Sequence, residues 1–295
     1  MNRLIRSSLC GYPFGFGCRH GVNIKAVSSL NYRNMSSFTQ SSIIDKMRTK
    51  SNISEYNQAI LKNHSNDPDG LALYMKRVSK TTANNLLVTG AFGTISYTAL
   101  SLFPEVFING VGVSIFAGSF ALGLFSLFKY ANIQPEIIKD DKGYILYKNP
   151  PNRKSWSNVL FATQGIIISP ALLIFSAHIP LALVVTGVIT AGSITGSLFQ
   201  PKGALLKMGP VLHTGLWGLL GISIAGIFIP EMHSIDLYGG VGLFTVYNMY
   251  DTHELIEEYE HGQVDHLSHS IDYSLNIINI FIRMLEILAR VNNKD

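Results

Sequence analysis

The chain has 295 residues, of which 47% are hydrophobic and only 14% are charged. Soluble globular domains carry about 25% charged residues, so this composition excludes an ordinary soluble domain. The net charge of +4 is spread over loops and the N-terminal arm, which excludes the single basic patch expected of a nucleic-acid-binding protein. Two runs, 84–128 with Glu105 as its one charged residue and 156–199 with none, have room for transmembrane helices of about 20 residues each.

The first 45 residues have the character of a targeting segment. They are rich in Arg and Ser, and Asp45 is their first acid. These features are typical of a mitochondrial transit peptide, and a disordered basic tail is the alternative. We therefore predict a presequence and disordered arm over 1–45, a polar matrix-side segment over 46–82 and a membrane domain over 83–295. Both cysteines, Cys10 and Cys18, lie in the arm and leave no disulfide or thiolate metal site for the membrane region.

The rest of the chain predicts an all-α, polytopic membrane helix bundle with about seven transmembrane helices. Prolines and polar loops separate the apolar runs, where a missing backbone N–H does least harm. The second connection contains "DDKGYILYK", which predicts a small β-hairpin. The expected runs are 84–103, 106–128, 157–177, 179–199, 209–229, 233–250 and 270–290.

The basic residues of the connections predict the orientation. Lys and Arg occur before the first run and in the second and fourth connections, whereas the first, third and fifth connections have none. All of these charges lie on the side of the N-terminus, and basic residues mark the side from which a membrane protein inserts. With a mitochondrial presequence, that side is the matrix, so the N-terminus and the hinge 251–269 are expected there.

The hinge 251–269 between the last two runs is rich in acids and holds four of the nine histidines. We expect its glutamates to form a solvated helical extension, or to gather cations at a pore mouth. His253 and His261 are expected in solvated loop. The "HLSH" spacing allows a zinc site on a helix, but a pH-responsive loop is the favoured interpretation, because His titrates in the physiological range.

The last apolar run carries a polar stripe. At 100° per residue its six polar residues fall within about 80° of arc, on one face of a helix. The stripe faces either the interior of the bundle, where charged groups are rarely idle, or water, with the helix lying on the membrane surface. The pattern slightly favours the surface helix. The stripe consists of Asp272, Asn276, Asn279, Arg283, Glu286 and Arg290.

Several of these residues resemble a known family. The segments "YDT" at 250–252, "EHG" at 260–262 and "NIF" at 279–281, with Asp265, His269 and Asp272, are similar to the C-terminal signature of the transmembrane Bax inhibitor motif family. Upstream, "SWSNVLFATQGIIISPALLIF" and "QPKGALLKMGPVLHTGLWGLLGISIAGIFIP" resemble its mitochondrial inner-membrane branch. The likeness covers about 73–290. It implies seven helices and an association with calcium or proton flux, suppression of cell death and cristae organisation.

The resemblance also implies a pair of aspartates on the last two helices. The first corresponds to Asp251, whereas the second falls on position 276, where this chain has Asn276; Asp272 lies one turn earlier. Two acids in one low-dielectric site repel each other, so they can share a proton, and its loss leaves hard oxygen ligands that suit calcium. We expect Asp251 and Asp272 to form the pair, with Asn276 as a neutral ligand or brace. The secondary candidates are Asp265, His269, Asn279 and Glu260.

Two functions are expected. The first is a proton-linked cation carrier or leak channel of the mitochondrial inner membrane, with calcium as the expected ion. The second is a non-transporting organiser of inner-membrane structure or cristae that also regulates cell death. We expect no catalytic activity and no cofactor, with calcium as a transported or regulatory ion. The expected partners are the lipid bilayer and other inner-membrane proteins, and nucleic acid is excluded.

Overall fold

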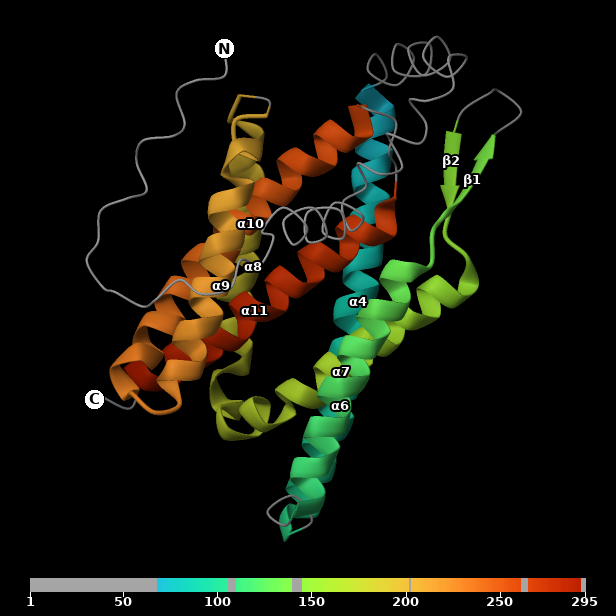
Figure 1. Cartoon of the computed structure of the whole chain (residues 1–295). Coiled ribbons are helices and arrows are strands. Elements are labelled where there is room, and N and C mark those ends of the chain that lie inside the picture. Colours follow the sequence, from blue (N-terminus) through green and yellow to red (C-terminus); the bar gives the residue numbers. More distant parts are fainter. Residues whose placement is uncertain (1–67, 106–109, 140–144, 202, 261–264, 293–295) are drawn as a thin grey trace, which may run out of the picture. The chain divides into compact units, whose positions relative to one another are not determined.

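The computed structural model describes residues 68–105, 110–139, 145–201, 203–260 and 265–292. This part of the chain contains seven α-helices of 18 residues or more, two short 3₁₀ turns and one two-stranded sheet (Figure 1). The predicted all-α bundle is confirmed. The expected presequence, 1–45, and the start of the polar segment, up to residue 67, lie outside the described residues.

The helices follow the order of the predicted apolar runs. The first helix begins at Pro68, well before the expected run, because the polar residues ahead of position 84 continue the same helix. The sixth helix extends ten residues beyond the run that ends at 250. The bounds are α4 Pro68–Leu102, α6 Gly110–Asn132, α7 Pro151–Ile174, α8 Ile179–Leu198, α9 Gly209–Gly226, α10 Pro230–Glu260 and α11 His266–Asn292.

Four of these helices are long and apolar enough to cross a membrane by length and composition. They are α6, α7, α8 and α9. The helices α4, α10 and α11 have 35, 31 and 27 residues, so they exceed the length of a span but carry more polar side chains. Many of those polar side chains bond to neighbouring helices, which is how a membrane bundle accommodates them.

The predicted hairpin lies between α6 and α7. Strand β1, Glu136–Lys139, pairs antiparallel with β2, Ile145–Lys148, and Glu136 stands opposite Lys148. Figure 1 shows this sheet beyond the ends of both helices. The hairpin ends at Asn149 and Pro150, directly before Pro151 opens α7, where proline fits the first helical position.

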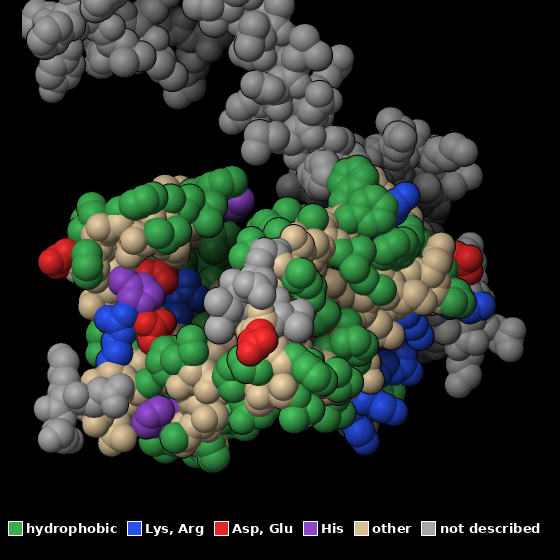
Figure 2. Space-filling view, turned by 90° about the horizontal axis from the view of Figure 1, so that it is seen from below, with side chains coloured by type: hydrophobic (Ala, Val, Ile, Leu, Met, Phe, Trp, Pro, Cys, Tyr) green, Lys and Arg blue, Asp and Glu red, His purple; other side chains and the backbone are tan. Residues whose placement is uncertain are grey.

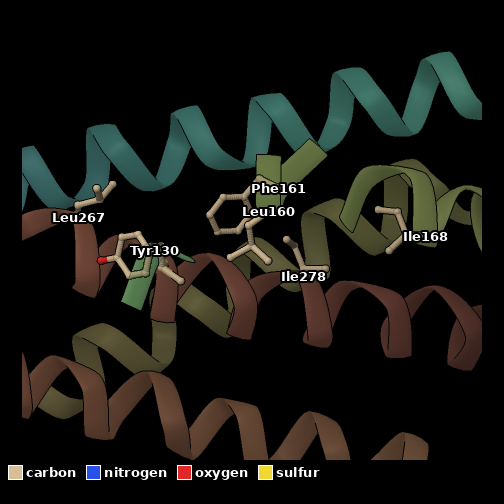
Figure 3. Packing of buried hydrophobic residues seen from close by; sticks show 7 residues of the cluster. Tyr130, Leu160, Phe161, Ile168, Leu267 and Ile278 are labelled. Carbon is tan, nitrogen blue, oxygen red and sulfur yellow. The ribbon is translucent and has the colours of Figure 1, made fainter. Parts of the chain in front are cut away.

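Helix α11 is enclosed by the bundle. It contacts α4, α7, α8 and α10, and its Ile280 and Leu285 have no exposed surface. One apolar cluster joins four helices: Phe161 of α7, Ile278 of α11 and Tyr130 of α6 belong to it, and side chains of α4 pack against it (Figure 3). The interpretation of the last run as a surface-lying helix is therefore wrong. The other faces of α11 are also apolar and buried, so its polar stripe points at a neighbouring helix.

Helices α4 and α7 approach each other closely through glycine. A side chain on Gly165 would place its Cβ 2.4 Å from the carbonyl oxygen of Thr89 and 2.8 Å from the backbone nitrogen of Gly93. Only hydrogen at this position allows the two backbones to come so near, as in other membrane helix pairs with small interfacial residues.

The outer surface of the bundle is apolar. Large hydrophobic side chains are exposed on α6, α8 and α9, among them Phe120, Val188 and Trp217. Figure 2 shows one face with mostly hydrophobic side chains, with acidic, basic and histidine side chains gathered at the left and further charged side chains, mostly basic, at the right. An apolar exterior of this extent is suited to lipid rather than water.

Candidate functional site

The central contact of the site joins α10 to α11. Asn276 donates a hydrogen bond from Nδ2 to Oδ2 of Asp251, over 2.6 Å. Both residues are buried, at 7% and 6% exposure. The distance is short for a nitrogen donor, as expected for a bond to a carboxylate. The structure thus places Asn276 in direct contact with the acid, in agreement with the expected neutral brace.

Asp272 lies near this contact but is differently placed. Its charge acts on Asp251, so the two carboxylates share one electrostatic environment. Within the described residues Asp272 forms no hydrogen bond or ion pair. The residue is accessible to solvent, although many protein atoms lie around its carboxylate. Asp251 is therefore the enclosed acid of the two, and Asp272 is the accessible one.

A second layer of polar groups follows toward the end of α10. His269 Nε2 lies 3.1 Å from Glu258 Oε2, an ion-pair distance at an angle unsuited to a hydrogen bond. The His269 ring also meets Tyr74 edge-on at 6.2 Å, and Tyr74 stacks on Tyr259 at 5.4 Å. Thr252 and Tyr273 share a hydroxyl hydrogen bond of 2.7 Å.

These surroundings shift the pKa values of two hinge residues, Glu254 and His269. Burial, together with the charges of Glu258 and Asp272, raises the pKa of Glu254 to about 7 against the opposing effect of His269. Burial disfavours the charged form of His269, but the contact with Glu258 outweighs burial and raises its pKa above the usual value of 6.5. Glu254 therefore changes charge near neutral pH, as a proton-responsive site requires, and His269 stays protonated to a higher pH than a free imidazole.

The prediction that the hinge 251–269 is exposed to solvent is wrong for its first half. His253 is buried at 5% exposure, and its Nε2 lies 3.0 Å from the carbonyl oxygen of Ser197 on α8. The glutamates do continue α10 to Glu260 as a helix, but Leu255 and Tyr259 on that extension are buried. The extension packs into the bundle because it alternates acids with large apolar side chains. His261 lies outside the described residues.

Asp265 belongs to a separate buried network. Its Oδ2 lies 2.7 Å from Arg153 of α7, with both side chains about 6–7% exposed. Asn149 donates to its Oδ1 over 3.1 Å, and Arg153 donates to the hydroxyl of Tyr130 over 2.7 Å. Asp265 also accepts the backbone N–H of Leu267, which caps the start of α11. We infer a structural role for Asp265, because buried Arg and carboxylate satisfy each other here.

The rest of the polar stripe of α11 faces α10. Arg283 Nη2 lies 3.2 Å from Asp236 Oδ1, and Ser223 of α9 donates to the same oxygen over 2.5 Å. Asn279 Oδ1 accepts from Arg283 over 3.1 Å. Farther along, Glu286 lies 2.5 Å from His233. Among the described residues, the hydrogen bonds and ion pairs that the stripe makes with another helix therefore all go to α10. Ser223 links α9 to the same group through Asp236.

Several buried polar side chains have atoms with no hydrogen-bond partner in the described structure, three of them on α8 and α10. Both amide atoms of Asn248, which is fully buried one turn before Thr252, are in this state, as are the hydroxyls of Thr186 and Thr190 on α8. Buried polar groups are normally hydrogen-bonded, so these side chains are exceptions within the bundle. Within the described residues no three His, Cys, Asp or Glu side chains cluster as metal ligands.

Sequence reasoning missed three contributors to these networks. Arg153 is a loop-edge basic residue in the sequence, and Asp236 is a single acid within an apolar run. Asn248 gives no sequence signal beyond its polarity. A charged or amide side chain inside a predicted span is itself a functional signal, and it could have drawn attention to Asp236 and Asn248.

The fold and the site define a polytopic membrane protein whose last two helices enclose the carboxylate of Asp251, which the amide of Asn276 holds. The family model "Inhibitor of apoptosis-promoting Bax1" matches residues 71–293, which is more than half of the chain. The chain belongs to this Bax inhibitor family.

The individual relatives match about half of this chain at 24–30% identity. Bax inhibitor 1 of Schizosaccharomyces pombe is 30% identical over 137 residues, 45% of this chain and 51% of the relative. The growth hormone-inducible transmembrane protein of Rattus norvegicus is 24% identical over 164 residues, 51% of this chain and 47% of that protein. Bax inhibitor 1 of Homo sapiens is 29% identical over 137 residues, 44% and 57% of the two chains. The chain spans about half the length of the curated relatives it matches.

Proposed function

We propose that this protein is a proton-linked cation carrier or leak channel, with calcium as the transported ion. The observation that carries the proposal is the enclosed carboxylate of Asp251, bonded to Asn276 and close to the accessible Asp272. A buried acid beside an accessible one can pass between a protonated form and a form that holds a cation.

The ligands near Asp251 suit a hard cation. Calcium prefers carboxylate and carbonyl oxygens, and it takes six to eight of them in flexible geometry. Asp251 and Asp272 supply carboxylates, and the amides of Asn276 and Asn248 supply carbonyl oxygens in the same part of the bundle. For Asn276 to act as a ligand, its amide has to turn its oxygen toward the ion, which breaks the bond to Asp251.

The hinge supplies the link to protons. Glu254 lies near the end of α10 and His269 near the start of α11; the pKa of Glu254 is raised to about 7 and that of His269 is raised above its usual value. Their charge state sets the local potential that a cation meets before it reaches Asp251. A rise in pH leaves the site more negative and favours cation entry, whereas a fall in pH opposes it.

We place this activity in the mitochondrial inner membrane, with the hinge 251–269 in the matrix. The Arg- and Ser-rich, acid-poor segment 1–45 supports this location, and so does the similarity to the growth hormone-inducible transmembrane protein. The one-sided distribution of Lys and Arg supports the orientation. The proposal includes no catalytic reaction and no resident cofactor.

A second function is favoured by the same contact. The neutral amide of Asn276 satisfies Asp251 without adding a second negative charge, and α10 and α11 are further joined by the Asp236–Arg283 ion pair. A bundle fixed in this way suits a non-transporting organiser of inner-membrane structure that regulates cell death. The family model, which carries the name of an inhibitor of Bax1, supports the cell-death part of this alternative.

Flux into liposomes distinguishes the two functions. Full-length protein is reconstituted, and calcium uptake is followed with an enclosed dye under an imposed proton gradient. A carrier gives uptake that depends on the gradient and falls at least tenfold in Asp251→Asn, with a smaller loss in Asp272→Asn. The control is Glu231→Gln, an exposed acid in the first turn of α10. Uptake equal to empty liposomes rejects transport and supports the organiser.

A further inference from the structure

A basic cavity lies where the starts of α7 and α11 meet α4. Its volume is about 280 Å³, just below the range of about 300–1,000 Å³ that small-molecule sites occupy. This size suits a single small polar group rather than a whole lipid or nucleotide. The described lining residues are Lys80, Thr81, Asn84, Asn85, Lys154, Asn158, His266 and Leu267.

The lining is positive and rich in donors. It includes two lysines and three asparagines and no carboxylate among the described residues. The acid next to His266 is Asp265, and Arg153 neutralises it at 2.7 Å. Burial is the main reason that the pKa of His266 is lowered; the charge of Asp265 opposes this, and the positive charges of Lys154, Arg77 and Arg153 lower it further.

The main donors of the cavity are not engaged by the protein. Within the described residues no hydrogen bond or ion pair involves the side chains of Lys80, Lys154, Asn84 or Asn158. By contrast, Asn85 donates to Ser274 over 3.2 Å and is held in place. Two ammonium groups and two amides of exposed residues thus border one cavity without a protein partner, and an anion with several acceptor oxygens would bind them together.

The cavity lies at the level where the start of α7 would meet the surface of a membrane. Lys154 lies in the first turn of α7, a helix that can span the membrane from Pro151. Trp156, half-buried two residues later, is a residue type that marks the membrane–water boundary. Basic pockets between transmembrane helices at this level are suited to lipid phosphates.

We propose that this cavity is a binding site for a phosphate group at the membrane boundary. Lys80 and Lys154 hold its charge from opposite helices, and the amides of Asn84 and Asn158 donate to its remaining oxygens. The phosphate belongs either to an anionic lipid headgroup or to a soluble phosphate compound, and the chemistry of the site is the same for both. Because α4, α7 and α11 all contribute, occupancy would hold these helices together independently of the Asp251 contact.

The test uses the full chain, purified in detergent and titrated with short-chain phosphatidic acid, with phosphatidylcholine and with inorganic phosphate. Binding is followed by native mass spectrometry and by the shift in thermal unfolding. We expect phosphatidic acid to bind, and its affinity to fall roughly tenfold or more in the Lys80→Gln, Lys154→Gln double variant. The charge-preserving Lys80→Arg, Lys154→Arg variant should retain binding and so report that the fold is intact.

A matched control removes the same charge elsewhere. Lys129→Gln with Lys207→Gln changes two exposed lysines that do not line the cavity, and it should leave binding unchanged. An equal loss in both double variants, or binding that ignores both, overturns the site, because the attraction is then diffuse. Inorganic phosphate that competes with the lipid and shows the same dependence on the variants identifies a soluble ligand. Failure of inorganic phosphate to compete, with lipid binding retained, identifies the headgroup.

Discussion

Asn276 and Asp251 join the last two helices through one hydrogen bond of 2.6 Å between buried side chains. A carboxylate at position 276 would instead repel Asp251, and the two would have to share a proton or a cation. The neutral amide of Asn276 instead donates a hydrogen bond to Asp251, so this contact needs neither a shared proton nor a cation. The residue at position 276 therefore sets whether this one contact between α10 and α11 needs a bound proton or cation.

We expect Asn276→Ala to lower the free energy of unfolding by about 1–3 kcal/mol, because it leaves a buried carboxylate without its donor. Chemical unfolding in detergent, followed by intrinsic fluorescence, measures the loss. The control Asn132→Ala removes an exposed amide at the end of α6 and should stay within about 0.5 kcal/mol of the parent. A loss no larger than that of the control would show that the contact does not stabilise the bundle.

Asn276→Asp should make calcium flux in liposomes more sensitive to pH than in the parent protein. The new acid shares its environment with Asp251, so one proton has to leave before a divalent cation can bind. The measurement is the slope of calcium uptake against pH. An unchanged slope would mean that position 276 does not face the transported ion.

Gly165→Ala should separate α7 from α4. The added Cβ would lie 2.4 Å from the backbone oxygen of Thr89, so the helices have to move, at a cost of about 1–3 kcal/mol. Gly90→Ala on α4 is the control, since a Cβ there meets nothing within 4 Å. Thermal unfolding of the two variants should differ, with Gly165→Ala the lower. Equal midpoints would argue against the close approach of these helices.

Arg153→Met should destabilise the fold by about 3–5 kcal/mol, because it leaves Asp265 charged and buried without its partner. Arg290→Met breaks an exposed pair with Glu286 and should cost at most about 1 kcal/mol. Unfolding curves of the two variants make the comparison. A restored midpoint in the double variant Arg153→Met, Asp265→Asn would show that the penalty comes from the stranded charge.

Stability should fall as the pH rises from about 4.5 to 7 because of Glu254. Its folded pKa of about 7 lies above the ordinary value of 4.5, so the folded state binds more protons in this window and loses stability as they leave. Glu254→Gln should flatten the unfolding midpoint over this range. His269, whose folded pKa is also raised, contributes stability that is lost only above pH 6.5, so that decline should persist in the variant. A parent midpoint that is flat between pH 4.5 and 7 would contradict the burial of Glu254.

The outline of the fold could be predicted because it depends on local patterns. Apolar runs with proline breaks predicted seven helices, and "DDKG" before "YILYK" predicted the hairpin. The polar stripe from Asp272 to Arg290 could be read as one face, since helical periodicity is set by the backbone alone. Periodicity does not say what a face touches. For that reason the pattern favoured a helix on the membrane surface. This prediction is wrong, because the other faces of α11 are buried too.

The sequence by itself determined the membrane class, the helix count and the family, and it singled out Asp251 and Asn276 as candidate site residues. The tertiary structure decided which partner each polar residue has. It joined Asn276 to Asp251, Arg283 to Asp236 and Arg153 to Asp265, and it buried His253, which had been expected in water. These pairs connect residues tens to more than a hundred positions apart. Their contacts follow from how seven helices pack around α11, and no local pattern in the chain encodes that packing.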